Sequence, residues 1–196
     1  LTVGAGLKLP VAKIAVGSLQ SAPPMPGFGN YTVDATVRQT PAGVAFGANI
    51  GGFGIRKLGV IAGRHDLAKG AGHADLSIPD LSLGPSGMWP DTIFPALRKY
   101  RNVTGRFGGD ARLAWHGDQL TGGAMLRLDG ISGETDDASL DGISGTITLD
   151  NLFPLSTAPD QRLRIRKIDA GVVVTDTSIR FALLPSGVLS IEHAEA

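Results

Sequence analysis

Residues 107–128 have the sequence FGGDARLAWHGDQLTGGAMLRL, in which apolar or small residues recur at every second position on both sides of a turn. In an extended chain this spacing places Leu113 and Trp115 on one face and Asp110 and Arg112 on the other. Gly117-Asp118 between the two halves fits a two-residue turn. The second half carries one apolar row, made of Leu120, Gly122, Ala124, Leu126 and Leu128. Residues 103–129 are therefore predicted to form a β-hairpin.

The same alternation continues before and after this hairpin, with turn residues between the runs. The further predicted strands are 32–39 and 44–53 joined at Pro41-Ala42-Gly43, 143–149 before Leu152-Phe153-Pro154, 162–166, and 179–183 and 189–193 joined through Pro185-Ser186-Gly187. One short helix is expected from Met88 to Tyr100, because Ile93, Leu97 and Tyr100 share a helical face. The predicted fold is mainly β.

The composition describes a globular chain rather than a disordered or nucleic-acid-binding one. Of 196 residues 42% are hydrophobic and 18% are charged, and the formal net charge is zero. The absence of Cys excludes disulfides and thiolate metal sites, and no apolar run approaches the roughly 20 residues of a membrane span. Because the sequence starts at Leu1 without a signal peptide, we expect a fragment of a longer protein whose membrane anchor lies elsewhere.

The sequence contains no recognisable catalytic or cofactor motif. The glycines at 51–54 lack the Lys-Ser/Thr pair of a phosphate loop, and no Ser lies in a G-x-S-x-G turn. His65 and His73 match no zinc spacing, and the carboxylates at 134–137 lack the calcium-loop pattern. We therefore predict no catalytic residue, no metal and no cofactor.

One hexapeptide occurs twice. Leu128-Asp129-Gly130-Ile131-Ser132-Gly133 recurs letter for letter at Leu140-Asp141-Gly142-Ile143-Ser144-Gly145. The offset is about one strand plus a turn, as in stacked meanders. A chance recurrence in a Gly- and Asp-rich β protein explains it equally well.

Three stretches after residue 71 form a recognisable series. They are residues 81–97, with IFPAL at 93–97, residues 102–117, which begin NVTG, and residues 142–161, GISGTITLDNLFPLSTAPDQ. In order and spacing, residues 71–196 resemble the YdbH family of AsmA-like bacterial envelope proteins, relatives of TamB. Asp160 departs from the Gly expected before Gln161. The family-motif residues carried over are Pro154, Leu155, Thr157, Gln161 and Gly171.

The resemblance implies a twisted, curved antiparallel sheet that forms an open β-groove. It also implies a periplasmic protein, anchored in the inner membrane, that shelters phospholipid acyl chains during transfer between the inner and outer membranes. We expect residues 1–196 to form a single groove fragment, to which residues 1–70, lacking the motifs, add further strands. The expected groove-lining residues are Phe107, Leu113, Trp115, Leu126, Leu128, Ile147, Leu149, Ile165, Phe181, Leu183, Leu189 and Ile191.

Alternatives remain open at this stage. The same apolar residues would equally form the dry core of a closed β-sandwich. The module could be a scaffold that binds an envelope lipoprotein through a strand edge. An older dicarboxylate-transport label for the family would require converging basic residues, for which the sequence offers only the row Arg162, Arg164 and Arg166. Arg106 and Arg112 suit a solvated face, with contact to a phosphate headgroup as the alternative.

Overall fold

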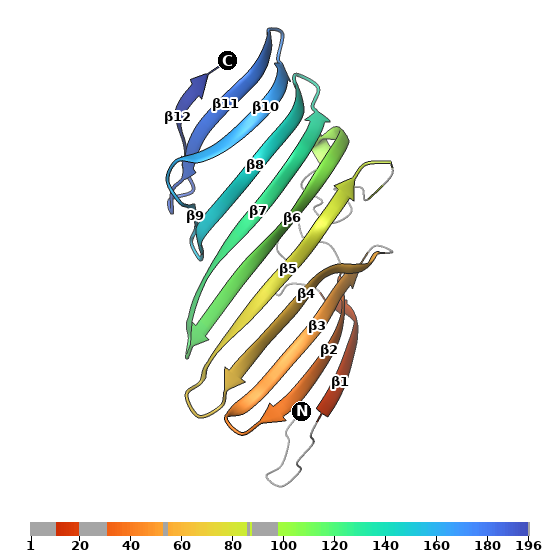
Figure 1. Ribbon diagram of the computed structural model, residues 1–196, viewed down its shortest axis with the longest axis vertical. Coiled ribbons are helices and arrows are strands. Elements are labelled where there is room, and N and C mark those ends of the chain that lie inside the picture. The colour runs from red at the N-terminus through yellow and green to blue at the C-terminus, as the bar shows by residue number, and fades with distance from the viewer. Residues whose placement is uncertain (1–10, 20–30, 53–54, 86, 88–97, 196) are drawn as a thin grey trace.

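The computed structural model describes residues 11–19, 31–52, 55–85, 87 and 98–195, which form twelve strands of one sheet (Figure 1). The strands are β1 (Val11–Leu19), β2 (Tyr31–Thr40), β3 (Gly43–Gly52), β4 (Ile55–Asp66), β5 (Ala71–Leu83), β6 (Arg101–His116), β7 (Gln119–Glu134), β8 (Ser139–Leu152), β9 (Leu155–Thr157), β10 (Gln161–Asp169), β11 (Val173–Leu183) and β12 (Leu189–Glu195).

The strands follow one another across the sheet in chain order. All pairs are antiparallel, and only the short β9 leaves the path, by pairing with the end of β8. In the described part of the chain β1 pairs only with β2, and β12 only with β11, so the sheet is open and not closed into a barrel. The predicted antiparallel, mainly β fold is confirmed.

The tight turns lie where the sequence predicts them. Gly117, with φ of 56°, begins the turn between β6 and β7, and Gly187, with φ of 80°, lies in the turn between β11 and β12. The helix expected from Met88 to Tyr100 falls almost wholly outside the described residues, which include only a short 3₁₀ turn at Arg98 and Lys99. No helix in the described ranges is long and apolar enough to cross a membrane.

The register sorts the side chains into an apolar face and a polar face, because residues paired across antiparallel strands point to the same side. Leu113, for example, pairs with Ala74 on β5 and Gly122 on β7, whereas its neighbour Arg112 pairs with Asp75 and Gly123. This alternation holds across the hairpins from β2 to β8. No second sheet covers the apolar face in the part of the chain that the structure describes.

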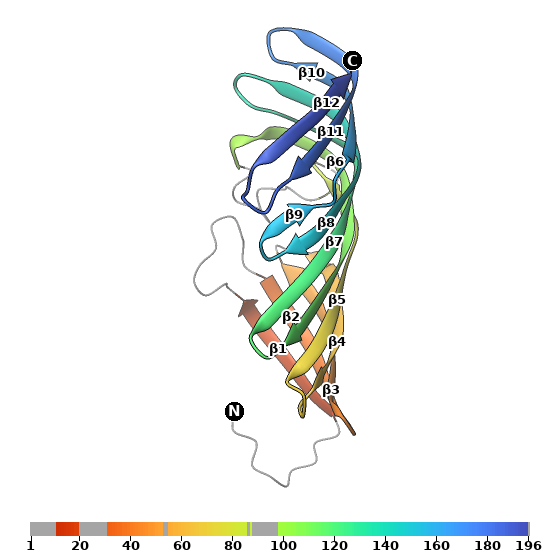
Figure 2. The same cartoon turned by 90° about the vertical axis from the view of Figure 1, so that its left-hand side faces the viewer.

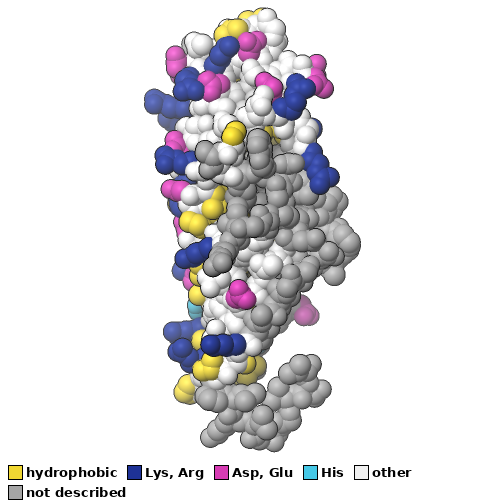
Figure 3. Space-filling model, turned by 90° about the vertical axis from the view of Figure 1, so that its right-hand side faces the viewer, with side chains coloured by type: hydrophobic (Ala, Val, Ile, Leu, Met, Phe, Trp, Pro, Cys, Tyr) yellow, Lys and Arg dark blue, Asp and Glu magenta, His cyan; other side chains and the backbone are white. Residues whose placement is uncertain are grey.

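The sheet is bent toward its apolar face. In Figure 2 the hairpin ends of β7–β8 and β10–β11, together with β9, extend to the left of the main body. Figure 3 is the opposite side view, and Lys, Arg, Asp and Glu side chains gather along its left edge, which is the right edge of Figure 2. The bend is therefore directed away from the charged side chains.

Glycines on the apolar face are covered by large side chains of neighbouring strands. A Cβ at Gly72 would collide with the ring of Trp115, and one at Gly63 would collide with the ring of Phe46. Leu113 lies over Gly122 in the same way. Large side chains can therefore lie flat across the sheet instead of standing upright, which keeps the apolar layer thin.

The polar face carries cross-strand pairs of Arg and Asp. Arg112 binds Asp75 at 2.6 Å, Arg127 binds Asp110 at 2.7 Å, and Arg166 binds Asp141 at 2.6 Å. Arg106 pairs with Asp129 across β6 and β7, and Arg101 binds Asp136 in the turn between β7 and β8. These pairs are solvent-exposed, so they contribute little to stability, but they match the strand register.

The repeated hexapeptide forms a reciprocal pair across β7 and β8. The backbone N–H of Gly130 donates to Ser144 Oγ at 2.9 Å, and that of Gly142 donates to Ser132 Oγ at 2.9 Å. Both glycines have positive φ, 61° and 70°, and the register shifts on both sides of Ile131. The two copies therefore face each other as matching bulges, which bend both strands at the same level.

Gln161 lies at the point where the partner of β8 changes from β10 to β9. Its side chain is buried, accepts a hydrogen bond from Thr148 N at 2.6 Å, and donates to Ala158 O and Pro159 O. It therefore supplies the backbone partners that a continuous ladder would otherwise provide.

Replacing Gln161 with Ala is expected to lower the free energy of unfolding by about 2 kcal/mol, because the Thr148 N–H is then buried without a partner. Urea unfolding followed by circular dichroism measures the change. Gln119→Ala, at an exposed site, is the matched control and should stay within about 0.5 kcal/mol of the unmodified protein. Equal urea midpoints for the two variants would contradict this role of Gln161.

The hydrogen bond from Arg127, followed by that from Ser77, lowers the pKa of Asp110 below its ordinary value of 3.8. A lowered folded-state pKa stabilises the fold above the unfolded pKa, and this contribution is lost as the pH falls through the folded value. Arg127→Gln should therefore raise the pKa of Asp110 toward 3.8 and reduce the loss of stability on acidification. Carboxyl carbon NMR titration tests this, with Arg164→Gln as the control that should leave Asp110 unchanged.

Candidate functional site

The apolar face is the largest feature of the sheet that could bind another molecule. Strand pairing places all the groove-lining residues expected from the sequence on this face. The alternation of β6 and β7 positions Phe107, Leu113, Trp115, Leu126 and Leu128, and their partners on β8 include Ile147. Toward the C-terminus the face continues through Ile165, Phe181 and Leu183.

Most of these side chains are half-buried rather than enclosed. Ile165 is the most buried, with 7% of its surface exposed, whereas Leu189 and Ile191 on β12 are 57% and 62% exposed. No described side chain is less than 2% exposed. A closed sandwich of this size would bury several large residues completely. The described residues therefore form an open apolar face and not a dry core.

One apolar row crosses the sheet without interruption from β2 to β8. Each member is the direct cross-strand partner of the next: Ala35, Ala48, Ile61, Leu76, Ala111, Ala124 and Leu149. At the usual strand spacing of about 4.8 Å the row is about 29 Å long. Because four of its members are Ala, its side chains protrude less from the sheet than those of a row of Leu or Phe would.

Aromatic side chains border one end of this face. The ring of Trp115 stacks on Phe46 with centroids 6.5 Å apart and on His65 at 6.0 Å. Trp115 Nε1–H donates to His65 Nδ1 at 3.0 Å, so the imidazole satisfies the indole on a surface that is otherwise apolar.

The best-packed point of the face lies where several strands have bulges. Leu58 is 6% exposed and packs against Tyr31, Leu81 and Phe107. The register of β5 against β6 shifts between Ile78 and Leu81, so Pro79 and Asp80 bulge out of the ladder. This cluster holds three strands and the start of β2 together beside the row of small side chains.

The family-motif residues hold the irregular edge around β9. Thr157 Oγ1 accepts a hydrogen bond from Leu183 N at 2.8 Å, which links β9 to β11. Pro154, after a cis peptide bond, forms the β8–β9 turn before the exposed Leu155, and Gly171, with φ of 85°, forms the β10–β11 turn. Together with Gln161 these residues shape the backbone rather than presenting reactive groups.

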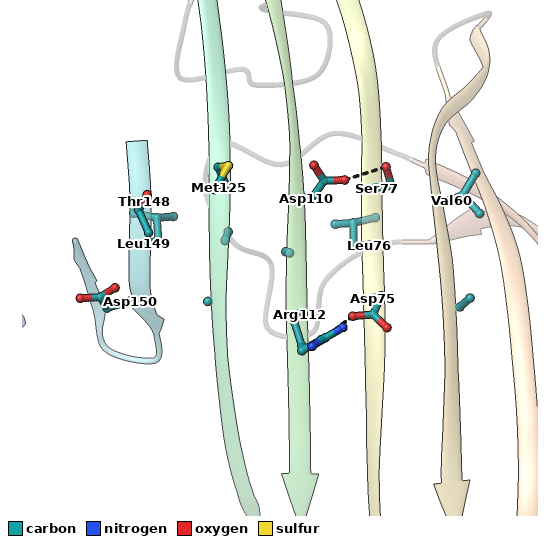
Figure 4. Close-up of a pocket in the computed structure, with 14 residues that line it drawn as sticks. Val60, Asp75, Leu76, Ser77, Asp110, Arg112, Met125, Thr148, Leu149 and Asp150 are labelled. Carbon is teal, nitrogen blue, oxygen red and sulfur yellow. Dashed lines mark hydrogen bonds and ion pairs between the residues drawn. The ribbon is translucent and has the colours of Figure 1, made fainter. Parts of the chain in front are cut away.

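The polar face has a shallow trough of about 790 Å³ across β4 to β8 (Figure 4). Three of its charged groups are already paired, since Arg112 binds Asp75, and Asp110 binds Arg127 and accepts a hydrogen bond from Ser77 at 2.8 Å. Met125 and Val60 provide apolar walls. Asp150 is the one charged lining residue without a hydrogen bond or ion pair to a described residue, so the trough offers a ligand a carboxylate but no unpaired cation.

The arginines singled out in the sequence have different surroundings. Arg106 and Arg112 are paired with aspartates on the polar face, and the hydrogen bonds that the two guanidinium groups donate to these aspartates raise the pKa of both arginines. In the row on β10 Arg166 binds Asp141, while Arg162 and Arg164 form no ion pair with a described residue. None of these side chains lies on the apolar face.

The two histidines considered as a metal pair lie on opposite faces. His65 contacts Trp115 on the apolar face, whereas His73 pairs with Arg64 on the polar face. Within the described ranges no three metal-ligating side chains gather.

The N-terminal half of the apolar face is not among the lining residues expected from the sequence. Val37, Phe46, Ile61 and Leu76 extend it over β2 to β5. The alternation at 32–39 and 44–53 predicts these strands, but it does not reveal which of their faces joins that of β6. The contact between Phe46 and Trp115, far apart in the sequence, supplies that link.

Comparison with known protein families matches residues 38–196 to the YdbH-like family, described as intermembrane phospholipid transport protein YdbH. The match begins upstream of residue 71, where the motif resemblance starts, and so includes β3 to β5. No curated protein and no solved structure matches the chain. The family description names a transport protein and no enzyme class. Because the match extends over most of the sequence and over the strands that build the open apolar face, the chain belongs to the YdbH-like family.

Proposed function

We propose that the apolar face binds the acyl chains of phospholipids and shelters them during transfer between the inner and outer membranes. The observation that carries this proposal is the half-buried apolar face, uncovered by a second layer in the described residues, in a chain of a phospholipid-transport family. We further propose that this function is carried out in the periplasm by a protein anchored to the inner membrane, as transport between the two membranes requires.

Transfer of a phospholipid through water is opposed by exposure of its hydrocarbon. Each CH₂ group costs roughly 0.8 kcal/mol in water, so a whole chain requires continuous apolar cover. The row from Ala35 to Leu149 provides such cover over about 29 Å, which is at least the length of an extended acyl chain. No specific bond is needed, which allows the chain to slide.

The smoothness of the apolar face also supports an acyl chain as its ligand. Trp115 and Phe46 lie flat over glycines of neighbouring strands, and the central row is rich in Ala. A protein partner would require protruding side chains and matched polar groups at its rim. A flexible hydrocarbon chain requires only a smooth apolar surface on the concave side of the sheet (Figure 2).

A second candidate function is a scaffold that binds an envelope lipoprotein. The observation in its favour is β12, which pairs on one side only in the described residues and exposes Leu189 and Ile191. An extended peptide could add to this edge through backbone hydrogen bonds. This function does not use the apolar row, so loss of lipid would leave it intact.

The test compares adjacent residues on opposite faces of β7. Leu126 lies on the apolar face between Gly109 and Ile147, and Met125 lies on the polar face with 46% of its surface exposed. Native mass spectrometry with lipid extraction, on protein purified from a bacterial envelope, should find about one bound phospholipid in the unmodified chain. Leu126→Asp should reduce the bound lipid at least tenfold, whereas Met125→Asp should retain it.

A second variant protects the test against misfolding. Ala124→Phe keeps the face apolar but obstructs the row, and should also lower lipid occupancy while far-UV circular dichroism stays unchanged. A folded, lipid-free protein that takes up no acyl probe would overturn the proposal. Equal loss of lipid from Met125→Asp and Leu126→Asp would do the same.

A further inference from the structure

The hairpin ends of β2–β3 and β4–β5 enclose a second cavity on the polar face, of about 570 Å³. Its lining residues with ionisable side chains are Arg38, Arg64, His65, Asp66 and His73. Of these, His65 faces the apolar side and contributes to the floor between Arg64 and Asp66. The cavity is separate from the trough of Figure 4, with which it shares no residue.

Three basic side chains of this cavity lie in one cross-strand row. Arg38 on β2 pairs with Ala45 on β3, Ala45 pairs with Arg64 on β4, and Arg64 pairs with His73 on β5. The two arginines are therefore two strands apart, at about 10 Å between their backbones, with only the methyl group of Ala45 between them. A small anion fits between two long guanidinium side chains at this spacing.

The arginines of this cavity, unlike the arginine of the trough, are not neutralised by a carboxylate of the described residues. Neither Arg38 nor Arg64 forms a hydrogen bond or ion pair within the described part of the chain, whereas Arg112 and Arg127 in the middle of the same face are paired with aspartates. Asp66, the one acidic lining residue, accepts hydrogen bonds from Ala68 N and Lys69 N and pairs with Lys69. The cavity therefore keeps an excess of positive charge.

Asp75, the acidic residue nearest to His73 on β5, is also ion-paired. Asp75 binds Arg112 at 2.6 Å, so it does not compete for Arg64. Arg162 and Arg164 on β10 also lack an ion pair with a described residue, but they line neither of the two cavities. The hydrogen bond with His193 lowers the pKa of Glu195, and the charges of Arg180 and Arg162 add smaller effects in the same direction.

We propose that this cavity is a binding site for a phosphate group, held between Arg38 and Arg64 with His73 beside it. Guanidinium groups donate paired hydrogen bonds to phosphate oxygens, and a tetrahedral phosphate presents acceptors toward both sides of the cavity. The site lies on the face opposite the apolar row, so it is distinct from the surface proposed to bind acyl chains. Its phosphate comes either from a soluble phosphate ester or from lipid headgroups at a membrane surface.

The experiment titrates the whole 196-residue chain with inorganic phosphate and follows the side-chain Nε–H signals of arginine by NMR. Saturable shifts of two arginine signals are expected, and Arg38→Gln or Arg64→Gln should weaken binding at least tenfold. Arg164→Gln removes an equally unpaired positive charge from the same face away from the cavity, and should change the affinity less than twofold. Ala45→Asp places a carboxylate between the arginines and should abolish binding while both arginines remain.

Two further ligands separate the sources of the phosphate. Glycerol 3-phosphate tests a soluble ester, and vesicles of phosphatidylglycerol against phosphatidylcholine test anionic headgroups, with the same variants in each case. Loss of vesicle binding in Arg38→Gln but not in Arg164→Gln would assign the site to the membrane surface. Stronger saturable binding of succinate than of phosphate would overturn the proposal, as would equal effects of Arg38→Gln and Arg164→Gln.

Lipid occupancy measured on the same variants keeps this proposal separate from the proposed function. Arg38→Gln should leave the bound phospholipid unchanged, because Arg38 lies on the polar face. If phosphate binding fails while lipid remains bound, only the anion site is wrong. If Leu126→Asp keeps its lipid while phosphate binding behaves as expected, only the acyl-chain face is wrong.

Discussion

Antiparallel pairing in a fixed register between the bulges is the constraint on which the rest of this structure depends. From β2 to β8 each strand is bonded to its chain neighbours, and successive residues therefore alternate between two faces over seven strands. A slip of one residue at any ladder would move charged side chains such as Arg112 onto the apolar face. The cross-strand ion pairs on one face and the covered glycines on the other both follow from this alignment.

The described residues form a single-layer sheet, and the pattern of side-chain sizes explains how it buries apolar area without a second layer. Large apolar residues lie over glycines of the next strand, so they bury area against the backbone instead of against a second sheet. The most buried apolar residue is the small Ala74, at 4% exposure, followed by Leu58 at 6% and Ile165 at 7%. What remains accessible is a thin apolar surface bordered by Trp115 and its histidine partner.

Much of this architecture follows from local patterns. The turn at Gly117-Asp118 and the alternation around it predict the central hairpin, and the lining residues from Phe107 to Ile191 fall on one face because each strand is amphipathic by itself. The cavity between Arg38 and Arg64 could not be predicted, since it depends on two residues that meet only through β3. The contact of His65 with Trp115 depends in the same way on strands distant in the sequence.

The reciprocal hydrogen bonds between the two hexapeptides account for the Gly and Ser that the two copies share. Each serine serves the glycine of the other copy, so a change in one copy leaves a backbone amide of the other without its acceptor. Substitutions in the two segments are therefore coupled, and we expect related sequences to change both copies together or to keep both. The spacing between the two copies is set by the hairpin, because folding β8 back along β7 places the second copy beside the first.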